Sequence, residues 1–268
     1  MKRAICMLLF AISIVAPSVA ARAGDTDYVH LPTTALIDSL ATIDAPAPGV
    51  EDMASYDGFI GDDTPLRFES GVLGVPPPNV PPQMRELVRR GAAALPELLQ
   101  HLRDNRLTKL VVDGAWQSFS NEYVAREPKR MPLYCSLKCT GKAFTGTYTV
   151  KIGDICFAII GQIVNRPLEA VRYQATAGLI VNSPVEDPAL AARVKADWNN
   201  LGNEGLKAAL LTDLRRTLHL NGAPTAAEYY FRFPALRRLH FYFPDVYAGL
   251  QGDDLKTRRA FEKQEKRE

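Results

Sequence analysis

The residues best suited to binding chemistry follow the most apolar stretch of the chain. They form a polar group made of Asn165, Arg166, Glu169, Arg172, Tyr173 and Gln174. Arginine with amide and phenol neighbours suits a small or acidic ligand, and loops between helices often carry function. We therefore take Asn165, Arg166, Arg172 and Tyr173 as possible binding residues, together with Asp154 if the fold brings it to the same pocket. The alternative is a capped helix end whose charged side chains form intramolecular salt links.

Motifs for catalysis are missing from the sequence. It has neither a Gly-x-Ser-x-Gly elbow nor a His-Glu-x-x-His helix. The segment around Gly141 and Lys142 lacks the earlier glycine and the following Ser or Thr of a phosphate loop. Each histidine suits a surface or edge position better than a catalytic one. These scattered residues are His30, His101, His219 and His240. We expect no catalytic residue, no cofactor and no metal ion.

The first 23 residues have the three parts of a secretory signal. Lys2 and Arg3 precede a short apolar run, and small residues at Ala20 and Ala23 provide cleavage sites. The apolar run is shorter than the roughly 20 residues that span a bilayer. We therefore predict export to the periplasm or the outside of the cell, without a stable membrane anchor after cleavage.

Three cysteines remain after this cleavage. Export permits a disulfide, and an odd number of cysteines leaves one thiol unpaired. Cys156 belongs to an apolar helical stripe, so we expect it to be a buried thiol. Cys135 and Cys139 lie in a loop-like segment and are the predicted disulfide pair.

Charge gives no argument for nucleic acid as a partner. Cleavage removes three basic residues and no acid from the 32 Lys+Arg and 30 Asp+Glu of the chain, so the mature chain carries a net charge of −1. Residues 229–247 interleave arginines with aromatic rings, which is one way to stack bases. We favour a C-terminal core layer with its arginines outside, because export removes most nucleic-acid partners.

Apolar residues recur with a helical period through most of the chain after Pro82. Residues 84–91 and 95–102 each place one apolar face on a helix, with Gly91 ending the first helix and Pro96 in the first turn of the second. Residues 149–165 carry a wider stripe, with Thr149 and Asn165 as expected caps. Residues 187–198 and 203–220 indicate two further helices. Residues 107–148 give the weakest pattern and suit a short strand or a small hairpin, and 175–184 suit either helix or strand.

The stretch GAAALPELLQHLRD resembles the second helix of a HEAT-type repeat. The matching residues are Gly91, Ala94, Leu95, Pro96, Leu98, Leu99, Leu102 and Asp104. The match covers about one repeat at 84–104, with a partial second at 149–165. The resemblance implies a mainly α fold of short helical hairpins packed as an irregular array. It also implies another protein as the partner, because HEAT-like proteins are helical solenoids that usually bind proteins.

These patterns divide the chain into four parts. Residues 1–23 are the signal peptide, and 24–81 are an acidic, Pro-rich segment with one short helix. Residues 82–250 are the expected helical HEAT-like domain, and 251–268 are a charged tail expected to stay solvated. The favoured function is that of an exported, non-enzymatic binding protein. The alternative is an enzyme or small-ligand binder whose site forms only in the fold.

Overall fold

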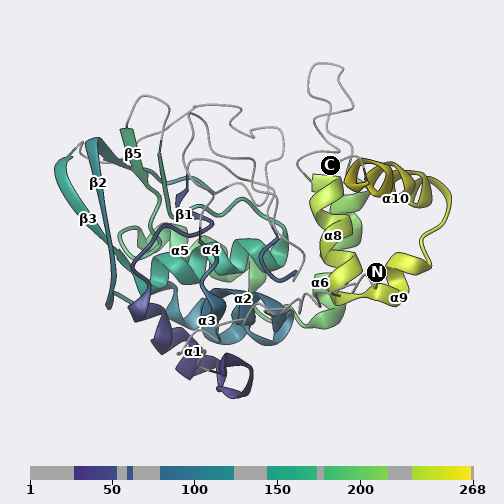
Figure 1. The fold of residues 1–268 in the computed structure, drawn as a ribbon, viewed down its shortest axis with the longest axis horizontal. Coiled ribbons are helices and arrows are strands. Elements are labelled where there is room, and N and C mark those ends of the chain that lie inside the picture. Colours follow the sequence, from purple (N-terminus) through teal and green to yellow (C-terminus); the bar gives the residue numbers. More distant parts are fainter. Residues whose placement is uncertain are drawn as a thin grey trace, which may run out of the picture.

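The computed structural model describes residues 27–52, 59–62, 79–123, 144–173, 178–216 and 231–266. The signal peptide and the predicted Cys135–Cys139 pair lie outside these residues. The described residues form a mixed α/β structure with a five-stranded sheet, so the expected mainly α HEAT-like array is wrong. Helices and strands share one hydrophobic core (Figure 1).

Helix α4, Ile152–Val164, lies at the centre of this core. All of its residues except Gln162 are buried, including Cys156 and the isoleucines of the predicted stripe. The helix starts at Ile152 because residues up to Lys151 belong to a strand, so Thr149 is not its cap. Asn165 ends the helix in the left-handed conformation at φ 59°, as the sequence indicated.

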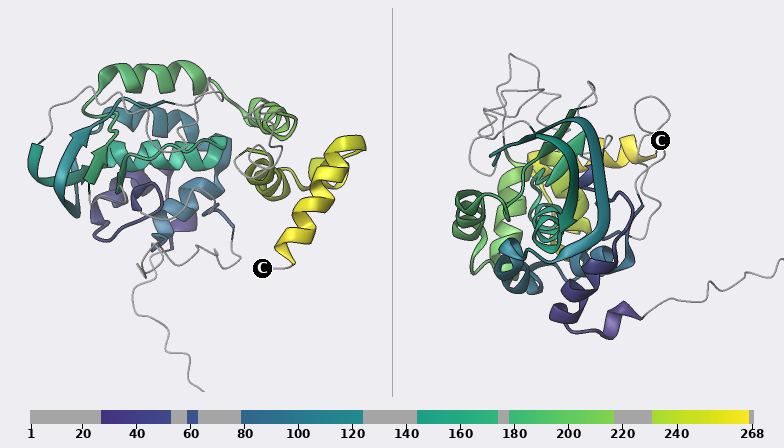
Figure 2. Two further views of the ribbon diagram at one scale, coloured as in Figure 1. Left: turned by 90° about the horizontal axis from the view of Figure 1, so that it is seen from above. Right: turned by 90° about the vertical axis from the view of Figure 1, so that its left-hand side faces the viewer.

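The sheet joins segments from both halves of the chain. Its strand order is β1-β4-β5-β2-β3, with β1–β4 and β2–β5 parallel and β4–β5 and β2–β3 antiparallel. The strands are β1 Val50–Asp52, β2 Leu107–Phe119, β3 Phe144–Lys151, β4 Val171–Tyr173 and β5 Gly178–Val181. The long β2–β3 ribbon curves around α4, which is seen end-on in Figure 2. Residues 107–148, for which a short strand or a small hairpin was expected, therefore supply β2 and most of β3, the two longest described strands.

Short helices cover α4 on the side away from the sheet. They are η1 Tyr28–His30, α1 Thr33–Ser39, η2 Leu40–Thr42, α2 Pro82–Arg89, η4 Gly91–Ala93, α3 Leu95–Gln100 and η5 His101–Arg103. Helices α2 and α3 both contact α4, which buries their apolar faces. Between them, Gly91 has φ +54°, and a Cβ there would meet the Tyr242 ring at 2.8 Å. The predicted helical joint is therefore real, but its two helices pack on α4 and not in a repeat array.

The remaining helices extend the molecule away from the sheet. They are α5 Pro188–Trp198, α6 Asn203–Leu214, α8 Phe233–Tyr242, α9 Pro244–Ala248 and α10 Gly252–Glu265. Helix α8 packs on α6, and the Tyr242 hydroxyl donates a hydrogen bond to the Val88 carbonyl. Helix α10 lies outermost (Figures 1 and 2), with Phe261 packed against Phe233. The expected solvated tail is thus helical over most of its length.

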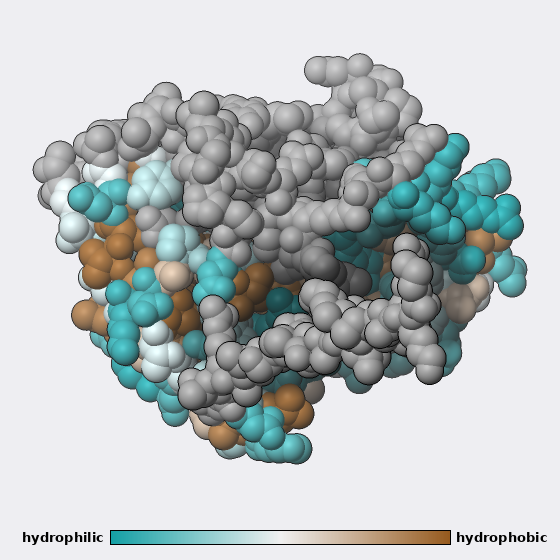
Figure 3. Space-filling model, viewed as in Figure 1, coloured by the Kyte–Doolittle hydropathy of each residue, from teal (hydrophilic) through white to brown (hydrophobic). Residues whose placement is uncertain are grey.

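The described surface is mostly polar with two small apolar areas. Leu107 and Val111 on β2 are 58% and 54% exposed, and Val29 in η1 is 62% exposed. Figure 3 shows apolar surface on the β2–β3 side of the molecule. Among the described helices, none has the length and apolar character needed to cross a bilayer.

Candidate functional site

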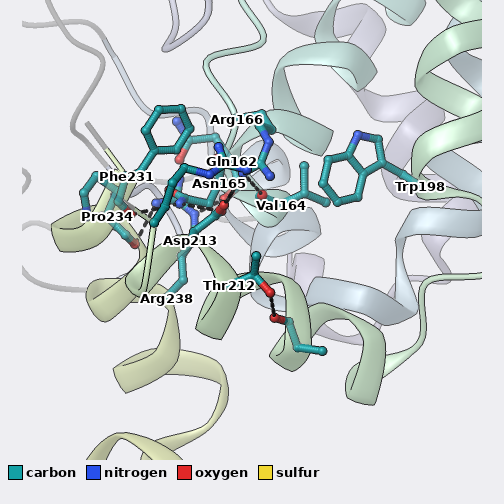
Figure 4. Close-up of polar contacts among 12 residues, drawn as sticks. Gln162, Val164, Asn165, Arg166, Trp198, Thr212, Asp213, Phe231, Pro234 and Arg238 are labelled. Carbon is teal, nitrogen blue, oxygen red and sulfur yellow. Dashed lines mark hydrogen bonds and ion pairs between the residues drawn. The ribbon is translucent and has the colours of Figure 1, made fainter. Parts of the chain in front are cut away.

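Polar side chains converge at the C-terminal end of α4. The Arg166 guanidinium donates from Nη1 to the Asn165 carbonyl at 2.7 Å and to Asp213 of α6. The Asn165 amide donates to the same Asp213 oxygen at 3.0 Å and to the Phe231 carbonyl at 3.2 Å. Figure 4 shows Asn165, Arg166 and Asp213 gathered between α4, α6 and the start of α8. The left-handed turn at Asn165 makes this possible, because it brings Arg166 back toward the helix end.

Two further arginines join this group from neighbouring segments. Arg216 follows α6, and its Nη2 lies 3.5 Å from the second carboxylate oxygen of Asp213. Arg238 of α8 donates from Nε to the Gln162 carbonyl and from Nη1 to the Pro234 carbonyl. Burial has the largest effect on the pKa of Arg238 and lowers it; among the smaller effects, the charge of Asp213 raises this pKa and that of Arg166 lowers it. We call Arg166, Asp213, Arg216 and Arg238 the arginine cluster.

Aromatic rings surround the guanidinium groups. The Arg166 guanidinium lies 5.3 Å from the Trp198 ring centroid and 5.8 Å from that of Phe231. Arg216 lies 4.7 Å from the Phe231 centroid, and Arg238 lies 4.8 Å from that of Phe59. Such cation–π contacts hold the planar groups in place and keep water from them.

Burial distinguishes this cluster from surface ion pairs. The side chains of Arg166 and Asp213 are 5% and 0% exposed, and that of Arg216 is 18% exposed. Burial lowers the pKa of Arg238 to about 10. Burial also lowers the pKa of Arg216, an effect that Asp213 opposes and Arg166 increases. Arg238 stays protonated at neutral pH, because a value near 10 is well above 7.

The cluster carries more positive than negative charge. Within the described residues it combines three guanidinium groups with one carboxylate, Asp213. Among the described residues, two of its buried donors, Arg166 Nε and Arg216 Nη1, have no hydrogen-bond partner, and one buried acceptor, Asp213 Oδ1, has none either. Buried polar groups are nearly always hydrogen-bonded, and an unpaired buried charge is costly. The unused donors and the excess charge suit an anion.

Asp154, a predicted member of the same pocket, lies at the opposite end of α4. Its carboxylate accepts hydrogen bonds from the Tyr148 hydroxyl at 2.7 Å, the Lys151 backbone N–H at 2.9 Å and the Ser183 hydroxyl. Burial raises the pKa of Asp154, and these hydrogen bonds oppose the rise. Asp154 therefore fixes the start of α4 and ties it to β3 and to the segment after β5.

Arg172 and Tyr173 form a third group on β4. The Arg172 guanidinium donates to the Glu122 carboxylate at 2.6 Å, and the Tyr173 hydroxyl donates to the Asp113 carbonyl at 2.6 Å. Burial raises the pKa of Glu122, while the charge of Arg172 and its hydrogen bond lower it. Intramolecular salt links, the alternative to a binding site in the sequence analysis, describe the Arg172–Glu122 pair. The five predicted binding residues are thus spread over three places, and only Asn165 and Arg166 lie in the arginine cluster.

No family, curated protein or solved structure matches this chain. The residues described here contain no group of three or more His, Cys, Asp or Glu side chains that could hold a metal ion.

Several cluster residues were missed by the sequence reasoning. Asp213 follows Leu206 and Leu210 at helical spacing, and a carboxylate on the apolar face of a helix was the available signal. Arg238 was expected outside its core layer, yet it is 5% exposed. Arg216 and Trp198 gave no local signal, because only the tertiary fold brings them to the end of α4.

Proposed function

We propose that this chain is a binding protein that holds a small anionic ligand at the arginine cluster. One observation carries the proposal: among the described residues, two buried guanidinium donors, Arg166 Nε and Arg216 Nη1, lack a partner in a cluster that has excess positive charge and one unpartnered acceptor, Asp213 Oδ1. An anion would accept from both donors and neutralise part of the charge. Charge-assisted hydrogen bonds of this kind are among the strongest in proteins.

Helix capping explains only part of the cluster. Arg166 and Arg238 donate to carbonyls at the C-terminal end of α4, where the helix dipole favours positive charge. Those bonds use Arg166 Nη1 and Arg238 Nε. They leave the Nε of Arg166 unused, and they do not involve Arg216 at all. A purely structural cap would not need Arg216.

Access to the cluster is most direct at Arg216. Its side chain is 18% exposed, against 5% for Arg166. The sequence-based predictions of export and of a protein partner stand beside this proposal as expectations.

The test is anion binding by the full chain at constant ionic strength. Phosphate, sulfate, acetate and citrate are titrated by calorimetry, with chloride as the reference salt, because simple screening must be held fixed. An anion present at a hundred times its Kd stabilises the folded state by about 2.7 kcal/mol, so thermal unfolding gives a second readout. We expect at least one of these anions to bind and raise the Tm.

Arg216→Gln should weaken this binding at least tenfold, because it removes one unpaired donor and one charge. Arg215→Gln is the matched control, since Arg215 is the neighbouring residue, is 61% exposed and pairs with Asp254. The control should bind as the wild type does. Absence of binding by all four anions, or equal losses in the two variants, would refute the proposal.

A further inference from the structure

We infer that the arginine cluster takes a doubly charged tetrahedral oxyanion group, phosphate or sulfate, in preference to a carboxylate. This inference rests on the proposed function and adds the chemical class of the ligand. It follows from the charge of the cluster and from the origin of its unused donors.

Charge favours a dianion. Three guanidinium groups and one carboxylate among the described residues leave an excess of two positive charges. The C-terminal end of α4 contributes about −0.5 of a charge, which reduces the excess to about 1.5. A phosphate monoester carries about −1.5 to −2 at pH 7 and matches this value. A carboxylate, with a single charge, would leave buried positive charge uncompensated.

The arrangement of donors points the same way. The two unused N–H groups belong to different guanidiniums, one before β4 and one after α6. In the single carboxylate of Asp213, Oδ2 accepts from Arg166 and Asn165, while Oδ1 lies 3.5 Å from Arg216 Nη2 and can satisfy at most part of the donors. A second planar carboxylate has only two oxygens for its donors. A tetrahedral anion presents oxygens in several directions and can therefore accept from more than one guanidinium at once.

Two other polar groups of the described structure are weaker candidates for a ligand site. The Asp154 group has its carboxylate oxygens engaged by three donors, so it offers nothing to a ligand. His101 and Asp104 form a pair at 2.9 Å, but Arg106 also binds Asp104, so this carboxylate is already engaged by two side chains. The arginine cluster alone combines excess charge with unused buried donors among these groups.

The test compares phosphate, sulfate and acetate at one ionic strength, by calorimetry on the full chain at pH 7.5 and pH 5.5. We expect phosphate and sulfate to bind at least tenfold more tightly than acetate at pH 7.5. At pH 5.5 the binding of methyl phosphate and of inorganic phosphate should weaken, because both lose their second negative charge on protonation, which occurs near pH 6 for a monoester. The binding of sulfate should not change, because sulfate keeps both charges. Methyl phosphate, used alongside inorganic phosphate, shows whether the site accepts a phosphate carried on a larger molecule.

Two variants separate charge from shape. Arg216→Gln lowers the charge excess by one and should reduce the preference for sulfate over acetate to less than about threefold. Arg216→Lys keeps the charge and should retain the preference even if both anions bind more weakly. Because Arg216 is partly exposed, the lysine variant also provides a folded protein if the glutamine variant does not fold.

The outcomes distinguish the two proposals. Acetate binding as tightly as sulfate, with loss of both in Arg216→Gln, would overturn the dianion and leave the anion site standing. Failure of every anion to bind would overturn both.

Discussion

Replacing Asp154 by alanine should destabilise the protein by about 3–5 kcal/mol. The carboxylate is fully buried and accepts hydrogen bonds from Tyr148, Lys151 and Ser183. Each donor left without a partner costs about 1–3 kcal/mol, which gives about 3–9 kcal/mol for three. Relief from burying a carboxylate offsets part of this cost, and removing one member of a buried polar group typically costs about 3–5 kcal/mol.

Asp154→Asn should cost less, about 1–2 kcal/mol, because the amide keeps one accepting oxygen and the same shape. Urea unfolding followed by circular dichroism measures both values. Asp113→Ala, at an exposed position on β2, is the control and should stay within about 0.5 kcal/mol of the wild type. If Asp154→Ala is as mild as this control, Asp154 does not hold the start of α4, and the assigned hydrogen bonds are wrong.

Three other substitutions test the fold. Leu99→Ala should cost about 2–5 kcal/mol in urea unfolding, because Leu99 is 4% exposed in the core; a cost below 0.5 kcal/mol would contradict its burial. Gly91→Ala should cost more than 1 kcal/mol in the same assay, because φ is +54° and the new Cβ would meet the Tyr242 ring at 2.8 Å; an unchanged Tm would show that this turn is not left-handed. At Asp104, burial acts to raise the pKa, but hydrogen bonds from Arg106 and His101 outweigh it and lower the pKa to about 2. Because the folded pKa lies below the unfolded one, the stabilisation is present above about pH 4 and is lost as the pH falls toward 2. Asp104→Asn should therefore cost about 1–2 kcal/mol at pH 6, after allowance for solvent screening, and clearly less at pH 3; a cost independent of pH would contradict the ion pair.

The helices could be predicted from the sequence because a period of 3.6 is visible within one segment. Helix α5 begins after Asp187, whose side chain accepts from the backbone of Ala189 and Leu190, as its capping signal indicated. The burial of α4 also followed from its apolar stripe. In both cases the deciding information is local.

The strands could not be predicted in the same way. On β2 the buried row contains Thr108, and the exposed row contains Leu107 and Val111, so the alternation of polar and apolar residues is lost. Strand β5 is buried at every position, and a short apolar run of this kind does not distinguish strand from helix. The sequence therefore contains no strand pattern that would have contradicted the mainly α fold implied by the HEAT resemblance.

The candidate site depends on contacts between distant segments. Arg166 meets an acid 47 residues further along the chain, at Asp213. The sequence placed Arg166 in a polar loop after an apolar helix, which was enough to single it out. It gave no partner for Arg166, because the position of α6 against α4 is set by the packing of the whole core.

The parallel strand pairs have a consequence for how the chain folds. Val50 pairs with Val171, and Trp116 pairs with Gly178, so about 120 and about 60 residues separate the partners. Closing such loops costs conformational entropy before any contact is gained, and proteins rich in distant pairings fold in milliseconds to seconds. Strands β4 and β5 come late in the chain and occupy the middle of the sheet. Until β5 pairs with it, β2 has an unpaired edge, and an unpaired strand edge is a template for pairing with another chain.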